Sequence, residues 1–167
     1  MLKGRDRPLP DGDRLIHTPR KFTVVAGAAE GPTRLNAFDN ALLRAGCGNL
    51  NLLKVSSILP PGALETPRIE IAPGSLVPTA FGAIESEREG EKIAAAIGVG
   101  LGSSDEYGVI MEFSGRCGKA EAEAEIRRRL EAAFEARGRL LERVIVKGVE
   151  HEVGTCGCAF AAVVLWG

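Results

Sequence analysis

The sequence predicts an α+β protein in which helices cover β-sheets. Three observations indicate this class: about seven segments have strand-like composition, two have helical periodicity, and the strands come in pairs rather than alternating strictly with helices. The chain has 167 residues, of which 45% are hydrophobic and 26% charged, which is enough to bury one hydrophobic core. No internal repeat or long polar linker divides it, so we expect a single domain over residues 1–167.

The predicted strands are short runs rich in β-branched and apolar residues. They cover residues 21–26, 49–57, 76–84, 92–101, 107–113, 140–153 and 158–166. Pro78 predicts an edge or irregular position for the third run, because proline cannot donate a ladder hydrogen bond. The last run is apolar throughout, which predicts burial on both faces. Gly98, Gly100 and Gly102 do not fit the template of a phosphate-binding loop and favour close sheet packing.

Two helices are predicted. A small-residue loop over 27–33 leads into the first, for which Asn36 is the expected N-cap and Gly46 the residue just past the end. The second covers residues 119–137 and shows an apolar residue at every fourth position, with charged faces that we expect to be solvated. This apolar stripe consists of Ala122, Ile126, Leu130 and Phe134.

Composition excludes several functional classes. The formal net charge is -1, without the clustered basic excess of a nucleic-acid-binding surface. No apolar run reaches about 18 residues, so no membrane-spanning helix is expected. Residues 1–19 are polar, contain three prolines and lack the apolar core of a signal peptide, which predicts a loose N-terminal arm. We therefore expect a cytoplasmic protein with neither a nucleic-acid nor a membrane partner.

Four cysteines are present, and two of them form a C-x-C pair at Cys156 and Cys158 with His151 nearby. This spacing differs from the C-x-x-C of the usual zinc sites, so we expect no metal. Without an export signal, free thiols are the expected state of the cysteines. The pair is better explained as small buried residues of a strand.

The most informative stretch is an extended apolar segment that runs into Ser56 and Ser57 and then into Pro60 and Pro61. A serine hydroxyl held against the preceding carbonyl can move the acyl group from nitrogen to oxygen. Elimination of the resulting ester leaves a dehydroalanine, which hydrolyses to a pyruvoyl group with loss of ammonia. A strand end followed by two prolines favours such constrained geometry. Taken alone, however, a serine pair is more typical of a hydrogen-bonded strand end.

Around this pair, several separated motifs resemble, in the same order, those of the pyruvoyl-dependent arginine decarboxylases. The resemblance extends from about Phe22 to Trp166 and includes the run Val-Ser-Ser-Ile-Leu-Pro-Pro. The matching segments are residues 25–27, 30–31, 35–43, 48–52, 55–61, 76–82, 110–113 and 157–162. Several ordered matches are more specific than any single short motif.

The resemblance implies that Ser57 is the precursor of a covalently bound pyruvoyl group. The chain would then cut itself between Ser56 and Ser57 into a short β chain, residues 1–56, and a longer α chain, residues 57–167. The pyruvoyl group would form a Schiff base with the substrate amine and accept the electrons released with carbon dioxide. Such an enzyme needs neither pyridoxal phosphate nor a metal.

Glu112 matches the catalytic acid of the family. The residues themselves allow this role, since Glu112 interrupts an apolar strand, and a carboxyl group in apolar surroundings has a raised pKa and can donate a proton near neutral pH. Strand alternation places Glu112 on the face of Ile110 and Gly108. The pattern alone is equally consistent with a carboxylate that points to solvent.

Asn51 and Asp39 complete the implied site. Asn51 matches a residue that helps to position the carbonyl for self-cleavage, although by pattern alone an ordinary outward-facing polar residue is favoured. Asp39 matches the acidic contact for the substrate guanidinium, a cation that pairs bidentately with carboxylates. It also suits the first turn of its helix, where a carboxylate is favourable, and the two roles are compatible.

The resemblance further implies a four-layer α/β/β/α sandwich assembled as a homotrimer or a dimer of trimers, with active sites between subunits. The implied reaction converts L-arginine to agmatine and carbon dioxide in polyamine biosynthesis. Two alternatives stay open. One is a pyruvoyl-dependent decarboxylase of another amino acid, such as histidine or aspartate, although Asp39 argues against an acidic substrate. The other is an uncleaved, non-catalytic assembly subunit, against which the intact Ser56, Ser57, Asn51 and Glu112 argue.

Overall fold

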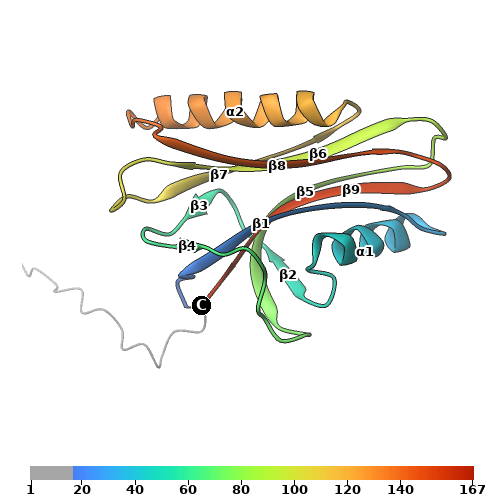
Figure 1. The fold of residues 1–167 in the computed structure, drawn as a ribbon, viewed down its shortest axis with the longest axis horizontal. Helices are drawn as coiled ribbons and strands as arrows, with labels where there is room; N and C mark the ends of the chain where they lie inside the picture. Colours follow the sequence, from blue (N-terminus) through green and yellow to red (C-terminus); the bar gives the residue numbers. More distant parts are fainter. Residues whose placement is uncertain (1–16) are drawn as a thin grey trace, which may run out of the picture.

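A computed structural model describes residues 17–167 and contains two β-sheets and two α-helices, which confirms the α+β class (Figure 1). Most of the predicted N-terminal arm, residues 1–16, lies outside the described residues, and residues 17–19 carry no regular secondary structure. Within residues 17–167 no helix combines the length and apolar character needed to cross a membrane.

In both sheets the spatial order of the strands differs from their order in the sequence. The first has the strand order β2-β5-β9-β1-β4 and the second β3-β7-β6-β8. In the sequence the elements are β1 (Lys21–Glu30), α1 (Arg34–Ala45), β2 (Asn51–Lys54), β3 (Ile58–Leu59), β4 (Leu64–Glu65), β5 (Leu76–Ser86), β6 (Lys92–Leu101), β7 (Gly108–Gly115), α2 (Lys119–Glu135), β8 (Arg143–Glu152) and β9 (Gly157–Trp166).

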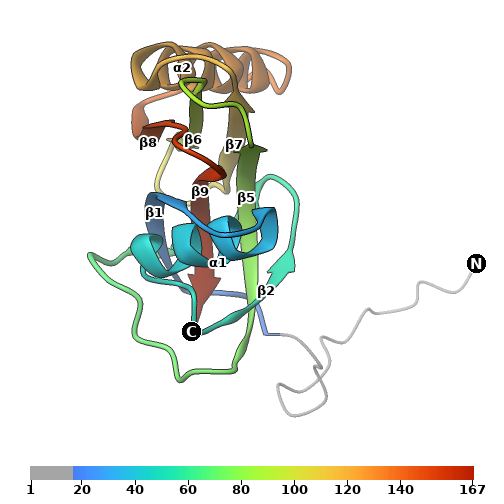
Figure 2. The same ribbon diagram turned by 90° about the vertical axis from the view of Figure 1, so that its right-hand side faces the viewer.

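Three clusters of buried side chains hold these elements together. One lies between the sheets and includes Ile97, Ile110 and Val163. A second joins α1 to the first sheet, and a third joins α2 to the second sheet. Each helix therefore covers the face of its sheet that points away from the other sheet, as Figures 1 and 2 show. The predicted burial of the last strand on both faces is confirmed, since its side chains contribute to both clusters of the first sheet.

The predicted loop over 27–33 is wrong in its first part, because residues 27–30 are the end of β1 and pair with β9 as far as Glu30, while only residues 31–33 lead into α1. Gly27 lies where α1 packs directly on the strand. A Cβ added to Gly27 would lie 2.5 Å from the Ala41 carbonyl oxygen. The predicted N-cap is also wrong: Thr33 caps α1, and its hydroxyl accepts the Asn36 N–H at 3.3 Å. Gly46 ends the helix with φ 82°, as expected.

The second sheet packs against α2 through the glycines of β6. A Cβ added to Gly98 would lie 2.4 Å from Cγ2 of Ile126, and one added to Gly100 would lie 2.7 Å from the Phe134 ring. The prediction of close packing at these glycines is confirmed. The apolar stripe of α2 is buried as predicted, although the helix ends at Glu135 rather than at residue 137.

The predicted strand over 49–57 is wrong in its extent. Only Asn51–Lys54 pair within the first sheet, and Ile58–Leu59 pair within the second, so the chain leaves one sheet for the other between them. β5 lies between β2 and β9, but its pairing with β9 starts only at Thr79. Pro78 therefore pairs with β2 alone and lies at a local edge, as predicted.

Glu30, the last residue of β1, holds the turn between β8 and β9. Its carboxylate accepts N–H bonds from Gly154, Thr155 and Cys156 at 2.9–3.0 Å and contacts the His151 ring at 2.5 Å. Partial burial alone would raise the pKa of Glu30, but these hydrogen bonds outweigh it and lower the pKa to about 2.

We predict that Glu30→Gln lowers the Tm at pH 7 by about 2–4 °C, the effect of losing roughly 1 kcal/mol of hydrogen bonding in a chain of this size. Because the folded-state pKa is depressed, the stabilisation by Glu30 is complete above about pH 4.5 and is lost as the pH falls toward 2. Thermal melting from pH 7 to pH 2.5 checks this. The exposed Glu152→Gln is the control, and a Glu30→Gln difference as large at pH 2.5 as at pH 7 would contradict the prediction.

Candidate active site

Ser56 and Ser57 lie where the chain crosses from the first sheet to the second. The last hydrogen bond of the first sheet runs from the Val55 N–H to the Thr79 carbonyl at 3.1 Å. The first bond of the second sheet runs from the Ile110 N–H to the Ser57 carbonyl at 2.7 Å. The peptide bond between the serines is thus tethered on each side to a different sheet. Ser56 is exposed and Ser57 half-buried.

Glu112 lies on β7 and points into the space between the sheets. It shares a face with Ile110, which belongs to the cluster between the sheets, whereas Met111 and Phe113 pack toward α2. Directly opposite is Gly82 on β5, where an added Cβ would lie 3.4 Å from the Glu112 Cβ. The side chain is half-buried, so the predicted sharing of a face with Ile110 is confirmed and the solvent-pointing alternative is wrong.

β7 brings Ser57 and Glu112 together. Ser57 is bonded to Ile110, and Glu112 is two residues further along the same strand. With about 4.8 Å between strands and about 3.3 Å per residue, the two backbones are on the order of 8 Å apart. A glutamate side chain spans part of this distance. The arrangement places a carboxyl group within reach of a small molecule attached at residue 57.

The surroundings of this pair are largely apolar. Leu59 and Ile110 are fully buried beside it. A hydrogen bond of 3.0 Å from the Ser114 hydroxyl to the Ala83 carbonyl ties β7 to β5 across the gap next to Glu112. An electrostatic interaction at this site is therefore screened less than at the open surface.

Asn51 is the first residue of β2, six residues before Ser57, and is exposed. Its side-chain amide donates to the Gly74 carbonyl at 2.7 Å, and its backbone N–H donates to Ser75 at 2.9 Å. Within one chain, then, Asn51 stabilises the loop before β5 and is not brought next to the serine pair.

Asp39 is on the exposed face of α1, and its expected place in the first turn is wrong, because the helix begins at Arg34 and Asp39 is its sixth residue. This helix covers the face of the first sheet opposite to the one that Glu112 approaches (Figure 2). Its neighbour Phe38 packs against Phe81 and Phe160, with ring centroids 6.5 and 5.9 Å away. A single chain does not bring Asp39 together with Ser57 or Glu112.

A groove of about 1040 Å³ opens beside β2, between the start of the described chain and its last residues. Its lining includes Leu53, Leu76 and Trp166, and the first two are 40% and 69% exposed. Val55 and Ile58, which flank the serines, are also exposed, at 36% and 44%. The side of the crossover that faces away from the core is therefore an apolar surface.

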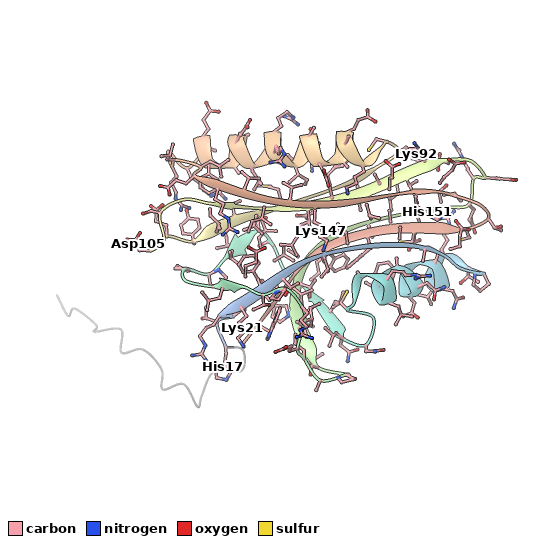
Figure 3. The ribbon with its side chains drawn as sticks, in the orientation of Figure 1. His17, Lys21, Lys92, Asp105, Lys147 and His151 are labelled. Atoms are coloured by element: carbon pink, nitrogen blue, oxygen red, sulfur yellow. The ribbon has the colours of Figure 1, made fainter. Side chains whose placement is uncertain are left out.

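Several polar residues of the chain lie outside this site. Cys156 and Cys158 are buried against α1, and burial raises the pKa of Cys158 to about 12. This agrees with the expected small buried residues, and all four cysteines are free thiols. His151 lies at the far end of β8, while Lys147 reaches from β8 toward β1 between the sheets (Figure 3). Residues 17–167 contain no group of three or more His, Cys, Asp or Glu side chains placed to hold a metal ion.

Sequence reasoning missed two contacts of Glu112. Gly82 gives the carboxylate its space, and Arg129 of α2 donates to the Glu112 carbonyl at 2.8 Å. Gly82 stands inside a strand, where a glycine often marks close approach of another group, so the sequence carried a signal for it. Arg129 is one of several arginines and glutamates of α2, and nothing in the sequence distinguishes it from the others.

Comparison with known proteins gives one consistent result. The family described as Pyruvoyl-dependent arginine decarboxylase (PvlArgDC) matches residues 21–167. A protein of Methanocaldococcus jannaschii named pyruvoyl-dependent arginine decarboxylase is 49% identical over 149 residues, covering 89% of this chain and 90% of its own. Proteins of the same name from Methanococcus maripaludis and Pyrococcus abyssi are each 45% identical, covering 90% and 89% of this chain and 93% and 96% of their own.

Proposed function

The chain belongs to the pyruvoyl-dependent arginine decarboxylase family, and we propose that it converts L-arginine to agmatine and carbon dioxide in polyamine biosynthesis. The observation that supports this most directly is the placement of Ser57 beside the strand that carries Glu112. The proposed electrophile is a pyruvoyl group formed from Ser57. A half-buried position beside Leu59 and Ile110, with one carboxyl group in reach, fits such a group.

In this proposal residues 1–167 form one decarboxylase domain that cuts itself after Ser56. The Ser57 hydroxyl attacks the Ser56 carbonyl, and the chain separates into residues 1–56 and 57–167. The hydrogen bonds of Val55 to the first sheet and of Ser57 to the second would keep the two new ends in place. Cleavage would therefore not require the fold to open.

The residues around the site have distinct proposed roles. When formed, the pyruvoyl group supplies a carbonyl that binds the substrate amine and withdraws electrons from the carbon that loses carbon dioxide. Glu112 holds the proton that this carbon receives, and the apolar neighbours Leu59 and Ile110 exclude water from it. Gly82 leaves the space in which the Glu112 carboxyl can move.

Asp39 and Asn51 require another subunit in this proposal, because a single chain keeps both away from Ser57. We propose a homotrimer, or a dimer of trimers, in which Asp39 binds the substrate guanidinium and Asn51 assists self-cleavage at an interface. Exposed apolar side chains beside the serines support a subunit contact there. They are Leu53, Val55, Ile58 and Leu76. The covering of each sheet by one helix supports a four-layer α/β/β/α sandwich of the family type.

We predict that Ser57→Ala stays a folded single chain of 167 residues without activity, because alanine has no hydroxyl to accept the acyl group. The intact mass of the purified protein checks this, and the parent should give two chains split after Ser56. Ser57→Cys keeps a nucleophile and should regain some cleavage. Normal two-chain processing of Ser57→Ala would refute the cleavage assignment, and an uncut but active parent would do the same.

We predict that Glu112→Gln, once cleaved, binds arginine but loses about 10²–10⁴-fold in kcat, since glutamine keeps the shape of the side chain but cannot donate the proton. The loss should leave KM nearly unchanged, because the missing interaction belongs to the transition state. Steady-state kinetics on protein shown by mass to carry the pyruvoyl group check this. A parental kcat in fully cleaved Glu112→Gln would show that another residue is the acid.

We predict that Asp39→Asn is cleaved normally but loses about 10- to 100-fold in kcat/KM for arginine, since a hydrogen bond to a charged group typically contributes about 1.5–3 kcal/mol. Asp105→Asn is the matched control, because Asp105 is an exposed carboxylate in the loop between β6 and β7 (Figure 3). Equal kcat/KM values for the two variants would remove Asp39 from the substrate site.

A further inference from the structure

The strand that carries Glu112 has an open edge at this residue. On one side β7 pairs with β6 along most of its length. On the other side β3 pairs with β7 only at Gly108 and Val109, and the bond between Ser57 and Ile110 is the last of that ladder. Backbone groups two residues apart point the same way, so the carbonyl of Glu112 faces the side that β3 has left. No strand among residues 17–167 pairs with β7 there.

Arg129 of α2 occupies this edge. Its Nη1 donates to the Glu112 carbonyl at 2.8 Å, and its Nε donates to the Glu125 carboxylate at 2.7 Å. The guanidinium also lies over the Phe113 ring, 5.1 Å from the centroid. Its side chain is 39% exposed, so the bonds form at the rim of the sheet rather than in the core.

These contacts fix the guanidinium from two sides. Glu125 is held in turn by Arg128, which donates to it at 2.7 and 2.9 Å. A planar guanidinium that is already oriented by a carboxylate loses little freedom when it makes a further bond. Arg129 therefore supplies the Glu112 carbonyl with the hydrogen bond that a neighbouring strand would otherwise donate.

We propose that Arg129 is a positioning residue for the proton donor: it fixes the backbone of Glu112 at the open edge of β7 and so sets where the carboxyl group lies relative to residue 57. This inference rests on the role proposed above for Glu112. Residues 110–112 of β7 are then held at both ends, because Ile110 is bonded to Ser57 and Glu112 to Arg129. A displacement of about 1 Å at a reacting group can cost up to about 100-fold in rate.

The experiment compares Arg129→Gln with Arg128→Gln. Arg128 is the matched control, because it is a neighbour on the same helix and its guanidinium binds Glu125 but not the backbone of β7. Amide hydrogen exchange is measured over residues 111–115, whether or not the variant has cut itself. In Arg129→Gln these amides should exchange at least about tenfold faster than in the parent, and in Arg128→Gln they should exchange at the parental rate.

Steady-state kinetics on cleaved protein give the second readout. Arg129→Gln should lose about tenfold in kcat with KM within twofold of the parent, Arg129→Lys should recover part of the loss, and Arg128→Gln should match the parent. A merely stabilising arginine would lower Tm without changing kcat per pyruvoyl group. Parental exchange over residues 111–115 in Arg129→Gln, or equal kcat losses in Arg128→Gln and Arg129→Gln, would overturn the proposal.

The two proposals fail in different ways. If cleaved Glu112→Gln keeps the parental kcat, the role of Glu112 is wrong, and the exchange rates still report whether Arg129 fixes β7. If Glu112→Gln is inactive and Arg129→Gln keeps the parental kcat, Glu112 is the donor and Arg129 does not position it. If Arg129→Gln does not fold, Arg129→Met, which keeps an unbranched side chain but has no donor, replaces it in both measurements, and parental exchange and kcat for that variant overturn the proposal.

Discussion

The crossing of the chain from one sheet to the other at the serine pair is the constraint on which the proposed site depends. β2 and β3 are separated by three residues yet belong to different sheets. A ladder bond holds the chain on each side, at Val55 and at Ser57. Because the bond to Ile110 fixes Ser57 against β7, it also fixes which residues of β7 lie near the site. The position of Glu112 relative to Ser57 follows from one hydrogen bond and the pleat of one strand.

The pleat then decides what each residue of β7 does. Alternate side chains pack toward α2 or into the space between the sheets, and Glu112 falls in the second set. A slip of one residue would turn the carboxyl group toward α2 and place Met111 between the sheets. The carboxylate is accommodated in an apolar layer because β5 presents Gly82 opposite it. The glycine and the bond at Ile110 thus act on the same residue, one by leaving space and the other by fixing the register.

The sequence predicted whatever depends on local periodicity. The stripe of α2, the glycines of β6 and the face of Glu112 follow from spacing alone, and the structure confirms them. The sequence does not indicate that the predicted strand over 49–57 leaves the first sheet before residue 57, because its apolar composition continues through the point where the chain crosses to the second sheet. Residues 27–30 resemble a loop in composition although they form the end of β1, and Gly27 is required there because α1 packs on the strand. The bond from Arg129 to the Glu112 carbonyl joins residues 17 positions apart through a backbone oxygen, for which no sequence pattern exists.

A single chain separates the proposed chemistry from the proposed recognition of substrate. Ser57 and Glu112 are joined by β7, whereas Asp39 stands on the exposed face of α1 beyond the first sheet. A helix that packs through Ala37 and Ala41 cannot turn Asp39 inward without losing that contact. Arginine is long, with its guanidinium several bonds from the carbon that reacts, so its two ends can be held by different surfaces. In the proposed trimer, the exposed apolar residues around the serines contact a neighbouring subunit, and the carboxylate that selects arginine comes from across that contact.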